Sequence, residues 1–317
     1  MMFVKLLSLN RYLPLSPDRH EMPQFSTDLE ANAMAQVLAG SSAFCFGTAI
    51  VTSRFGLRGI DARAGAAISI PSAALLLLVA SPFFLNASAF AFRAALVFGV
   101  VGFLFPALVA VLRFHATERL GSTVTGAVMG TGPLFAVGAA SLWLDEIVPA
   151  RAVLATLGVV GGIGLLSCKS ATSTSTRRGW WLALPIAAAA IAGCAQASIK
   201  SGLLLWPNPF AATLICYSVS SVTVLAIDAL RKAKPARRAA KPLLWFAFTG
   251  VLNGAGVLSM YAALNSAPVS SVAPIVAAYP LVTLLFGAAL LREETIDLRV
   301  IAGALLTVAA IGYLVSG

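Results

Sequence analysis

PLLWFAFTGVLNGAGVLSMYAALNSAPVSSVAPIVAAYPLVTLLFGAALL, which is residues 242–291, contains no Asp, Glu, Lys or Arg. A helix that spans a bilayer needs roughly 17–25 predominantly apolar residues, so this stretch has room for two. Near its middle, Asn265-Ser266-Ala267-Pro268 is typical of a turn. We therefore expect two membrane-spanning helices here, over 242–263 and 269–291.

The same pattern continues along the chain. Uncharged stretches also cover 31–53, 64–92, 94–112, 120–144, 152–168, 179–199, 201–227 and 300–317. Each fits one spanning helix with a turn at its ends. The expected helices are 33–54, 64–84, 94–113, 120–143, 150–167, 180–203, 209–229 and 298–316. With the two above, the sequence predicts an all-α polytopic membrane protein with ten transmembrane helices.

Composition agrees with a protein that is solvated by lipid. Hydrophobic residues make up 59% and charged residues 11% of the chain, and the mean hydropathy is +0.90. A soluble domain has about 25% charged residues. Residues 1–30 differ, because they carry several charges and three prolines without a helical period. We expect them to form a flexible N-terminal tail.

The net charge of +10 is distributed unevenly between the two sides of the predicted bundle. Of 22 basic residues, 16 fall in or beside the loops after the odd-numbered helices. Such an excess marks the cytoplasmic side, which would place both termini outside. The basic run 231–241 then anchors the topology beside anionic lipid. This placement argues against a nucleic-acid partner.

Chemistry that would need a cofactor or a metal has no signature in the sequence. The four cysteines are isolated, and no Cys/His cluster is present, so we expect no metal site. There is no phosphate-binding loop, no HExxH and no arrangement of nucleophile and base. We therefore expect no cofactor and no enzyme activity.

The two halves of the sequence repeat. Pro133 precedes Glu146 by 13 residues, and Pro280 precedes Glu293 by the same 13. A basic residue ends the first predicted helix of each half, Arg54 and then Lys200. The predicted organisation is therefore a first five-helix repeat over 31–168, a linker over 169–179 and a second five-helix repeat over 180–317.

An odd number of helices in each repeat makes the second copy begin on the opposite side of the membrane. Two inverted repeats can exchange roles by rocking, which opens a site at their interface to each side in turn. This symmetry indicates a secondary transporter.

At these residues the sequence resembles the EamA-type ten-helix proteins of the drug/metabolite transporter superfamily. The resemblance rests on Pro133-x12-Glu146-x11-Gly158, on Pro280-x12-Glu293-x9-Gly303 and on the basic residues that end helices 1 and 6. It covers about residues 33–316. It implies two bundled repeats around a central cavity that moves small metabolites, often amino acids, mostly outward. Members of the family often have both termini in the cytoplasm, which is opposite to the charge bias.

All twelve acidic residues lie in predicted loops, in the tail or at helix ends. An exporter of cationic drugs would need a carboxylate within the membrane, so the sequence argues against that cargo. Arg54 and Lys200 are the candidates for holding an anionic group of a substrate. They could instead extend to the membrane surface and the helix C-terminal dipole.

Uncharged polar residues inside the predicted helices are the other candidates for substrate binding: Gln196, Asn253 and Tyr279. An amide without a hydrogen-bond partner is costly in lipid, so Gln196 and Asn253 should face a cavity or another helix. Pro133 and Pro280 are candidate hinges or kinks. Glu146 and Glu293 are expected to cap the following helix or to pair with nearby arginines.

The sequence thus predicts a multi-pass protein of the inner (cytoplasmic) membrane. It would export a small polar metabolite, such as an amino acid or a related zwitterion or anion, by alternating access. A multidrug or uptake transporter of the same fold is an alternative, as is a non-transporting regulator or a membrane enzyme. Gly126-x3-Gly130 could form the face of a homodimer.

Overall fold

The computed structural model describes residues 24–85, 90–120, 125, 128–167, 180–230, 240–291 and 298–316. Within these ranges all regular structure is helical, as the sequence predicted. The first half contains α2 (Gln24–Leu57), α3 (Ala62–Phe84), α4 (Phe92–Gly102), the π-helix η3 (Phe103–Leu108), α5 (Val109–Leu120), α7 (Gly132–Trp143) and α8 (Ala150–Ser167). The second half contains α9 (Ala183–Leu205), α10 (Pro209–Ala229), α11 (Ala240–Ser266), α12 (Val269–Val276), α13 (Tyr279–Leu291) and α14 (Leu298–Val315).

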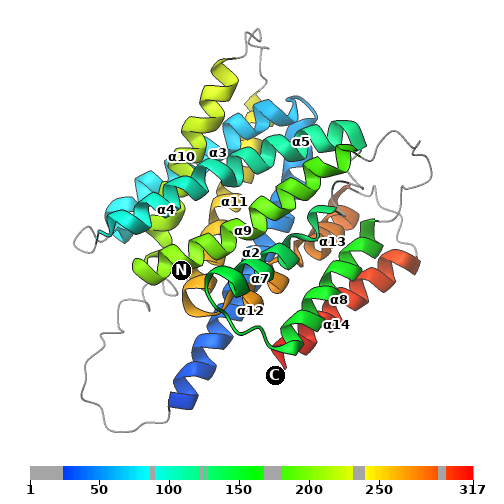
Figure 1. Ribbon diagram of the computed structural model, residues 1–317. Helices are drawn as coiled ribbons and strands as arrows, with labels where there is room; N and C mark the ends of the chain where they lie inside the picture. The colour runs from blue at the N-terminus through cyan, green and yellow to red at the C-terminus, as the bar shows by residue number, and fades with distance from the viewer. Residues whose placement is uncertain are drawn as a thin grey trace.

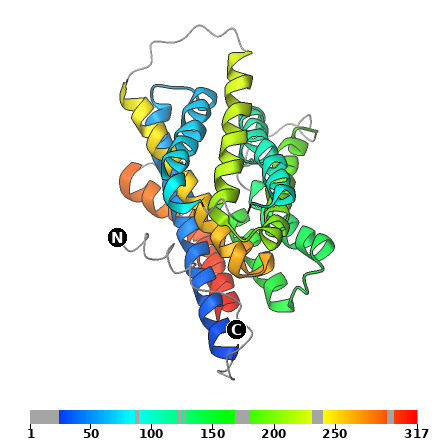
Figure 2. The same cartoon turned by 90° about the vertical axis from the view of Figure 1, so that its left-hand side faces the viewer.

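These elements form ten membrane helices, because some spans consist of consecutive elements. In the described residues eight spans are long and apolar enough to cross a bilayer, and two shorter apolar helices, Gly132–Trp143 and Ala150–Leu166, complete the ten. The fold class predicted from the sequence is confirmed. The start of α2 and the end of α14 lie at the same end of the bundle (Figure 1, and from the side in Figure 2).

Three details differ from the sequence prediction. α2 begins at Gln24, so residues 24–30 of the predicted tail are helical, whereas 1–23 lie outside the described residues, as does the predicted linker 169–179. The third span continues to Leu120 instead of ending at Arg113. It is interrupted at Phe105, whose backbone is extended (φ −133°, ψ 126°) just before Pro106.

The helices pair across the two repeats in a symmetric way. α2 packs on α11 and α13, and its counterpart α9 packs on α4, α5 and α7. α3 packs on its own counterpart α10, and α8 packs on its counterpart α14. Figure 1 shows α8 and α14 side by side at one edge of the bundle. Each repeat therefore buries its apolar faces against the other, and neither forms a closed core alone.

Two glycines carry matching contacts in the two repeats. A Cβ atom added to Gly193 of α9 would lie 2.6 Å from the carbonyl oxygen of Gly132. A Cβ atom added to Gly47 of α2 would lie 2.7 Å from the carbonyl oxygen of Tyr279. Positions 132 and 279 are separated by 147 residues, the same offset as Pro133 and Pro280. The first helix of each repeat thus approaches the backbone of the fourth span of the other repeat, and the two points of approach are equivalent positions in the two repeats.

Those points of approach are also helix interruptions. A turn at Ala277 and Ala278 separates α12 from α13, and Pro280 is the second residue of α13. A turn at Gly130 and Thr131 likewise precedes α7, in which Pro133 is the second residue. Proline fits a first helical turn because the missing N–H has no intrahelical partner there. Both fourth spans are therefore broken at the middle of the bundle.

We use two names for the ends of the bundle. The even-loop end carries residues 144–149, 206–208 and 267–268, which connect α7 to α8, α9 to α10 and α11 to α12. The odd-loop end carries the turn 58–61, the end of α10 and the start of α11. The start of α2 and the end of α14 belong to the even-loop end.

Candidate functional site

A cavity of about 300 Å³ lies between the two repeats. Its walls come from α2, α3, η3, α5, α7 and α8 of the first repeat and from α9 to α13 of the second. The interruptions described above form part of these walls, through Pro106, Pro133 and Tyr279. Broken helices at the interface of inverted repeats are a typical place for a transporter's binding site. The cavity is therefore the candidate substrate site.

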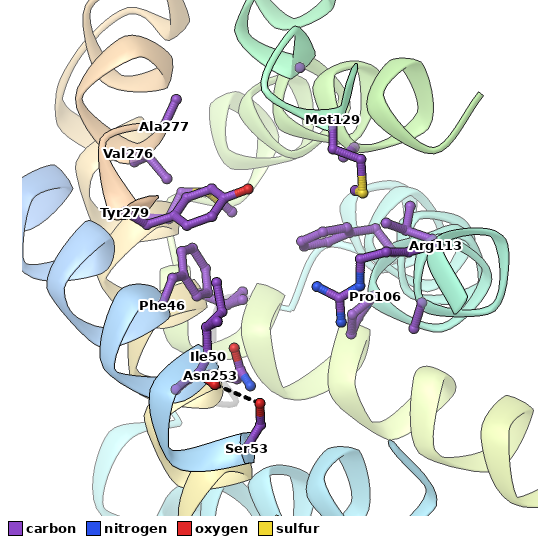
Figure 3. A pocket seen from close by; sticks show the side chains of 18 of the residues that line it. Phe46, Ile50, Ser53, Pro106, Arg113, Met129, Asn253, Val276, Ala277 and Tyr279 are labelled. Carbon is purple, nitrogen blue, oxygen red and sulfur yellow. Dashed lines mark hydrogen bonds between the residues drawn. The ribbon is translucent and has the colours of Figure 1, made fainter. Parts of the chain in front are cut away.

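Most of the wall is apolar or aromatic, as Phe46, Ile50 and Phe246 illustrate. Hydroxyl groups on the wall are engaged locally. Ser53 donates to the carbonyl oxygen of Ile50 at 2.7 Å, and Thr249 shares a 2.9 Å hydrogen bond with Thr52. The first of these bonds is drawn in Figure 3. The few remaining polar groups are therefore the ones that can orient a ligand.

Arg113 is the charged residue among the described residues that line the cavity, and no acidic side chain is among them. It lies on α5, and its guanidinium group points into the cavity from the wall that also carries Pro106 (Figure 3). The side chain is solvent-exposed even though the backbone lies within the bundle, because it extends into this open space. A guanidinium group in this position can form two parallel hydrogen bonds to a carboxylate.

Two residues of α5, His115 and Arg119, contact other helices toward the odd-loop end. His115 of α5 lies 3.1 Å from Arg63 of α3, between Nε2 and Nη2. The other ring nitrogen, Nδ1, lies 2.9 Å from the carbonyl oxygen of Val111. Because a carbonyl only accepts, Nδ1 carries the proton and Nε2 accepts from Arg63. Arg119, two turns beyond Arg113, lies over the Trp181 ring at 4.6 Å.

Three of the candidates from the sequence, Gln196, Asn253 and Tyr279, line the cavity. Asn253 and Tyr279 lie on the wall that faces Arg113 (Figure 3). The side-chain oxygen of Gln196 is buried and accepts no hydrogen bond within the protein. Pro133 also lines the cavity, whereas Pro280 does not. A hinge role for the two prolines stays a prediction.

Arg54 and Lys200 are not among the cavity-lining residues. Arg54 is exposed in the last turn of α2, at the odd-loop end. The Lys200 ammonium group donates to the carbonyl oxygens of Leu264 and Ala267, at 2.6 Å and 3.1 Å. These contacts place the Lys200 ammonium group at the end of α11. A role of Arg54 and Lys200 in substrate binding stays a prediction, and Arg113 is the basic residue among the described residues that line the cavity.

Glu146 has a structural contact that differs from the expected one. Its carboxylate accepts from the backbone N–H groups of Val269 and Ser270, at 3.0 Å and 2.9 Å. It therefore caps α12 of the second repeat instead of the helix that follows it in the chain. Glu293 lies outside the described residues.

The fold and this interface cavity define a membrane transporter built from two inverted repeats. The sequence matches the model of the EamA-like transporter family twice, over residues 33–168 and 179–316. The chain belongs to this family, within the drug/metabolite transporter superfamily, as the resemblance had implied.

Two other comparisons add less. A crystal structure of a protein that is 13% identical superposes with a TM-score of 0.75, over 89% of this chain and 96% of that one. At this identity the likeness shows the fold alone. No curated protein matches the sequence.

Proposed function

We propose that the protein is a secondary transporter of a small metabolite that carries a carboxylate, such as an amino acid or a related organic anion. The observation that carries this proposal is the Arg113 guanidinium group inside a cavity whose described lining contains no acidic side chain. A guanidinium group in a largely apolar cavity favours an anionic ligand, because its paired N–H donors match the two oxygens of a carboxylate and such charge-assisted hydrogen bonds are strong. A bound substrate would then place its carboxylate against Arg113 of α5.

The size and the wall of the cavity limit the rest of the ligand. A volume of about 300 Å³ is at the lower end of the range for ligand pockets, which suits a small metabolite. Gln196, Asn253 and Tyr279 offer a carbonyl oxygen, an amide and a hydroxyl group. These groups can accept from an ammonium or hydroxyl group of the ligand. The apolar wall accommodates a side chain.

The distribution of basic residues between the two ends of the bundle supports a direction of transport. The positive-inside bias favours a cytoplasmic location for the odd-loop end and an inner-membrane location for the protein. Cavity-lining Leu57, Arg113 and Phe246 lie near that end. A cavity that approaches the cytoplasmic side can load cargo for export, and the cycle then depends on opening at the even-loop end.

The alternatives have less support. A multidrug exporter of cations would place an attractive carboxylate in the cavity, whereas the described lining offers a guanidinium group. A membrane enzyme would need a nucleophile with a base, and the cavity wall described above does not combine these groups. A non-transporting regulator would not need a ligand cavity between mobile repeats.

A comparative metabolite profile tests the proposal. Cells that express the protein should hold less of one or more small carboxylates than cells that express Arg113→Leu at equal abundance, and their medium should hold more. If only cationic or uncharged compounds differ between the two, the proposed substrate class is wrong.

A second test concerns Asn253, which faces the Arg113 wall. Asn253→Asp adds a negative charge with almost no change in shape, so we expect carboxylate affinity to fall by at least about tenfold through repulsion and competition for Arg113. Asn253→Leu removes only hydrogen bonding and should cost about fivefold. Binding measured by calorimetry in detergent distinguishes the two. Equal losses would show that charge is not what the site recognises.

A further inference from the structure

The turn between α11 and α12 is held from two sides by two charged side chains. Lys200 of α9 donates to the carbonyl oxygen of Leu264, in the last turn of α11, and to that of Ala267, in the connection itself. Glu146, in the loop after α7, accepts from the N–H groups of Val269 and Ser270, after it. We call Lys200, Glu146 and residues 264–270 the clamp. It joins the first repeat to the second through Glu146.

Each charge in the clamp matches the helix end that it contacts. The last carbonyl groups of a helix carry a partial negative charge and lack intrahelical partners, and the first N–H groups carry a partial positive charge. The Lys200 ammonium group contacts carbonyl groups at the end of α11, and the Glu146 carboxylate contacts N–H groups at the start of α12.

The clamp lies directly beyond the cavity, toward the even-loop end. Met260 of α11 and Ala273 of α12 line the cavity. Leu264 and Ala267 follow Met260 at spacings of four and seven, so they continue the same face of α11. Leu264 and Val269 are fully buried. The segment that the clamp holds therefore closes the path from the cavity to the even-loop end.

We propose that Lys200 and Glu146 keep the even-loop end closed and must release the α11–α12 turn before the cavity can open there. The inference rests on the transport cycle proposed above, since a static protein would not need release. Both are positioning residues, which act on the equilibrium between states without contacting the substrate. Losing either contact shifts the population toward the state that is open at the even-loop end.

Accessibility of a cysteine in the closed segment tests this without any substrate. Ala263 is fully buried on α11, between Met260 and Ala267. We would place Ala263→Cys in a variant whose own cysteines, Cys45, Cys168, Cys194 and Cys216, are replaced, and measure its reaction rate with a polar maleimide in detergent. Glu146→Gln and Lys200→Met should each raise the rate at least about fivefold. Lys200→Arg, which keeps the donors, should raise it less.

Two controls separate release of the clamp from general loosening. Arg151→Gln, at an exposed residue beside the same loop, should leave the rate unchanged. Ala64→Cys, buried with Ile60 and Phe246 near the odd-loop end, should label equally slowly in all variants. A parallel rise at both cysteines would mean loss of packing and would overturn the proposal. So would an unchanged rate at Ala263→Cys in both Glu146→Gln and Lys200→Met.

Exchanging the two charges tests the match to the helix ends. If Lys200 and Glu146 acted only as an ion pair, the double variant Lys200→Glu with Glu146→Lys would restore slow labelling. Because each exchanged charge would face a helix end of its own sign, we expect labelling to stay fast. Restored slow labelling would overturn the assigned contacts. Since no substrate is involved, fast labelling together with a failed metabolite profile would refute the substrate class and leave the clamp standing.

Discussion

Replacing Arg113 by Leu is expected to abolish measurable binding of the carboxylate substrate. A bound carboxylate would bury its pair with Arg113, and removing one partner of a buried, hydrogen-bonded charge pair costs about 2–5 kcal/mol. At about 1.4 kcal/mol for each factor of ten, the affinity should fall by at least about 30-fold. Binding to purified protein in detergent, measured by calorimetry or by stabilisation against heat, gives the loss directly.

Two further variants make this result specific. Arg113→Lys keeps the charge but not the fork of donors, so it should retain part of the affinity. Arg119→Gln changes an arginine of the same helix that lies over Trp181 and does not line the cavity. It should bind as the wild type does. An Arg113→Leu protein that still binds its carboxylate within about threefold would contradict the site.

The second large effect is expected at Gly193, where α9 meets the backbone of α7. A valine there would place its Cβ 2.6 Å from the Gly132 carbonyl oxygen and 2.7 Å from the Ala136 nitrogen. Both neighbours are backbone atoms of a helix, so they cannot move alone. Overpacking in a core costs about 1–3 kcal/mol, occasionally more. We expect Gly193→Val to lie at or above the top of that range.

Thermal unfolding in detergent measures this cost, and Gly138→Val on α7 is the matched control. A Cβ at Gly138 would have no neighbour within 4 Å, and the residue is exposed. Gly47→Val, the counterpart in the first repeat, should behave like Gly193→Val. If Gly193→Val and Gly138→Val unfolded at the same temperature, the close approach of α7 and α9 would be wrong.

The fold could be predicted because the membrane makes the signal simple. A spanning helix must be long, uncharged and apolar, so uncharged stretches separated by charges and turns are nearly sufficient to count the helices. The repeat followed from Pro133, Pro280, Glu146 and Glu293, whose spacing survives although the halves share few residues, and its inversion followed from the odd number of helices in each half. In the structure, Gly193 and Gly47 make equivalent close contacts with the backbone of the opposite repeat, as the same symmetry requires.

The site was harder to predict, because charge near a helix end has several explanations. Arg113 ends an uncharged stretch, so it was assigned to the membrane surface, but α5 continues for seven more residues to Leu120. The interruption at Phe105 shifts the register of this span. Lys200 was a candidate for substrate binding because it is the basic residue that ends the first predicted helix of the second repeat. Its contacts with the carbonyl groups of Leu264 and Ala267 could not be predicted, because these are backbone atoms far away in the sequence. The cost of an unpartnered amide in lipid did predict that Asn253 and Gln196 face a cavity or another helix, and both line the cavity, as does the candidate Tyr279.

The two repeats are expected to carry a carboxylate across the membrane by alternating access through the Arg113 cavity. Counterflow in proteoliposomes tests it most directly, with the radiolabelled carboxylate outside and an excess of the same unlabelled compound inside. We predict saturable uptake of label that is accelerated by the internal substrate and lost in Arg113→Leu. Uptake that is non-saturable and indifferent to internal substrate, or equal in wild type and Arg113→Leu, would contradict the account.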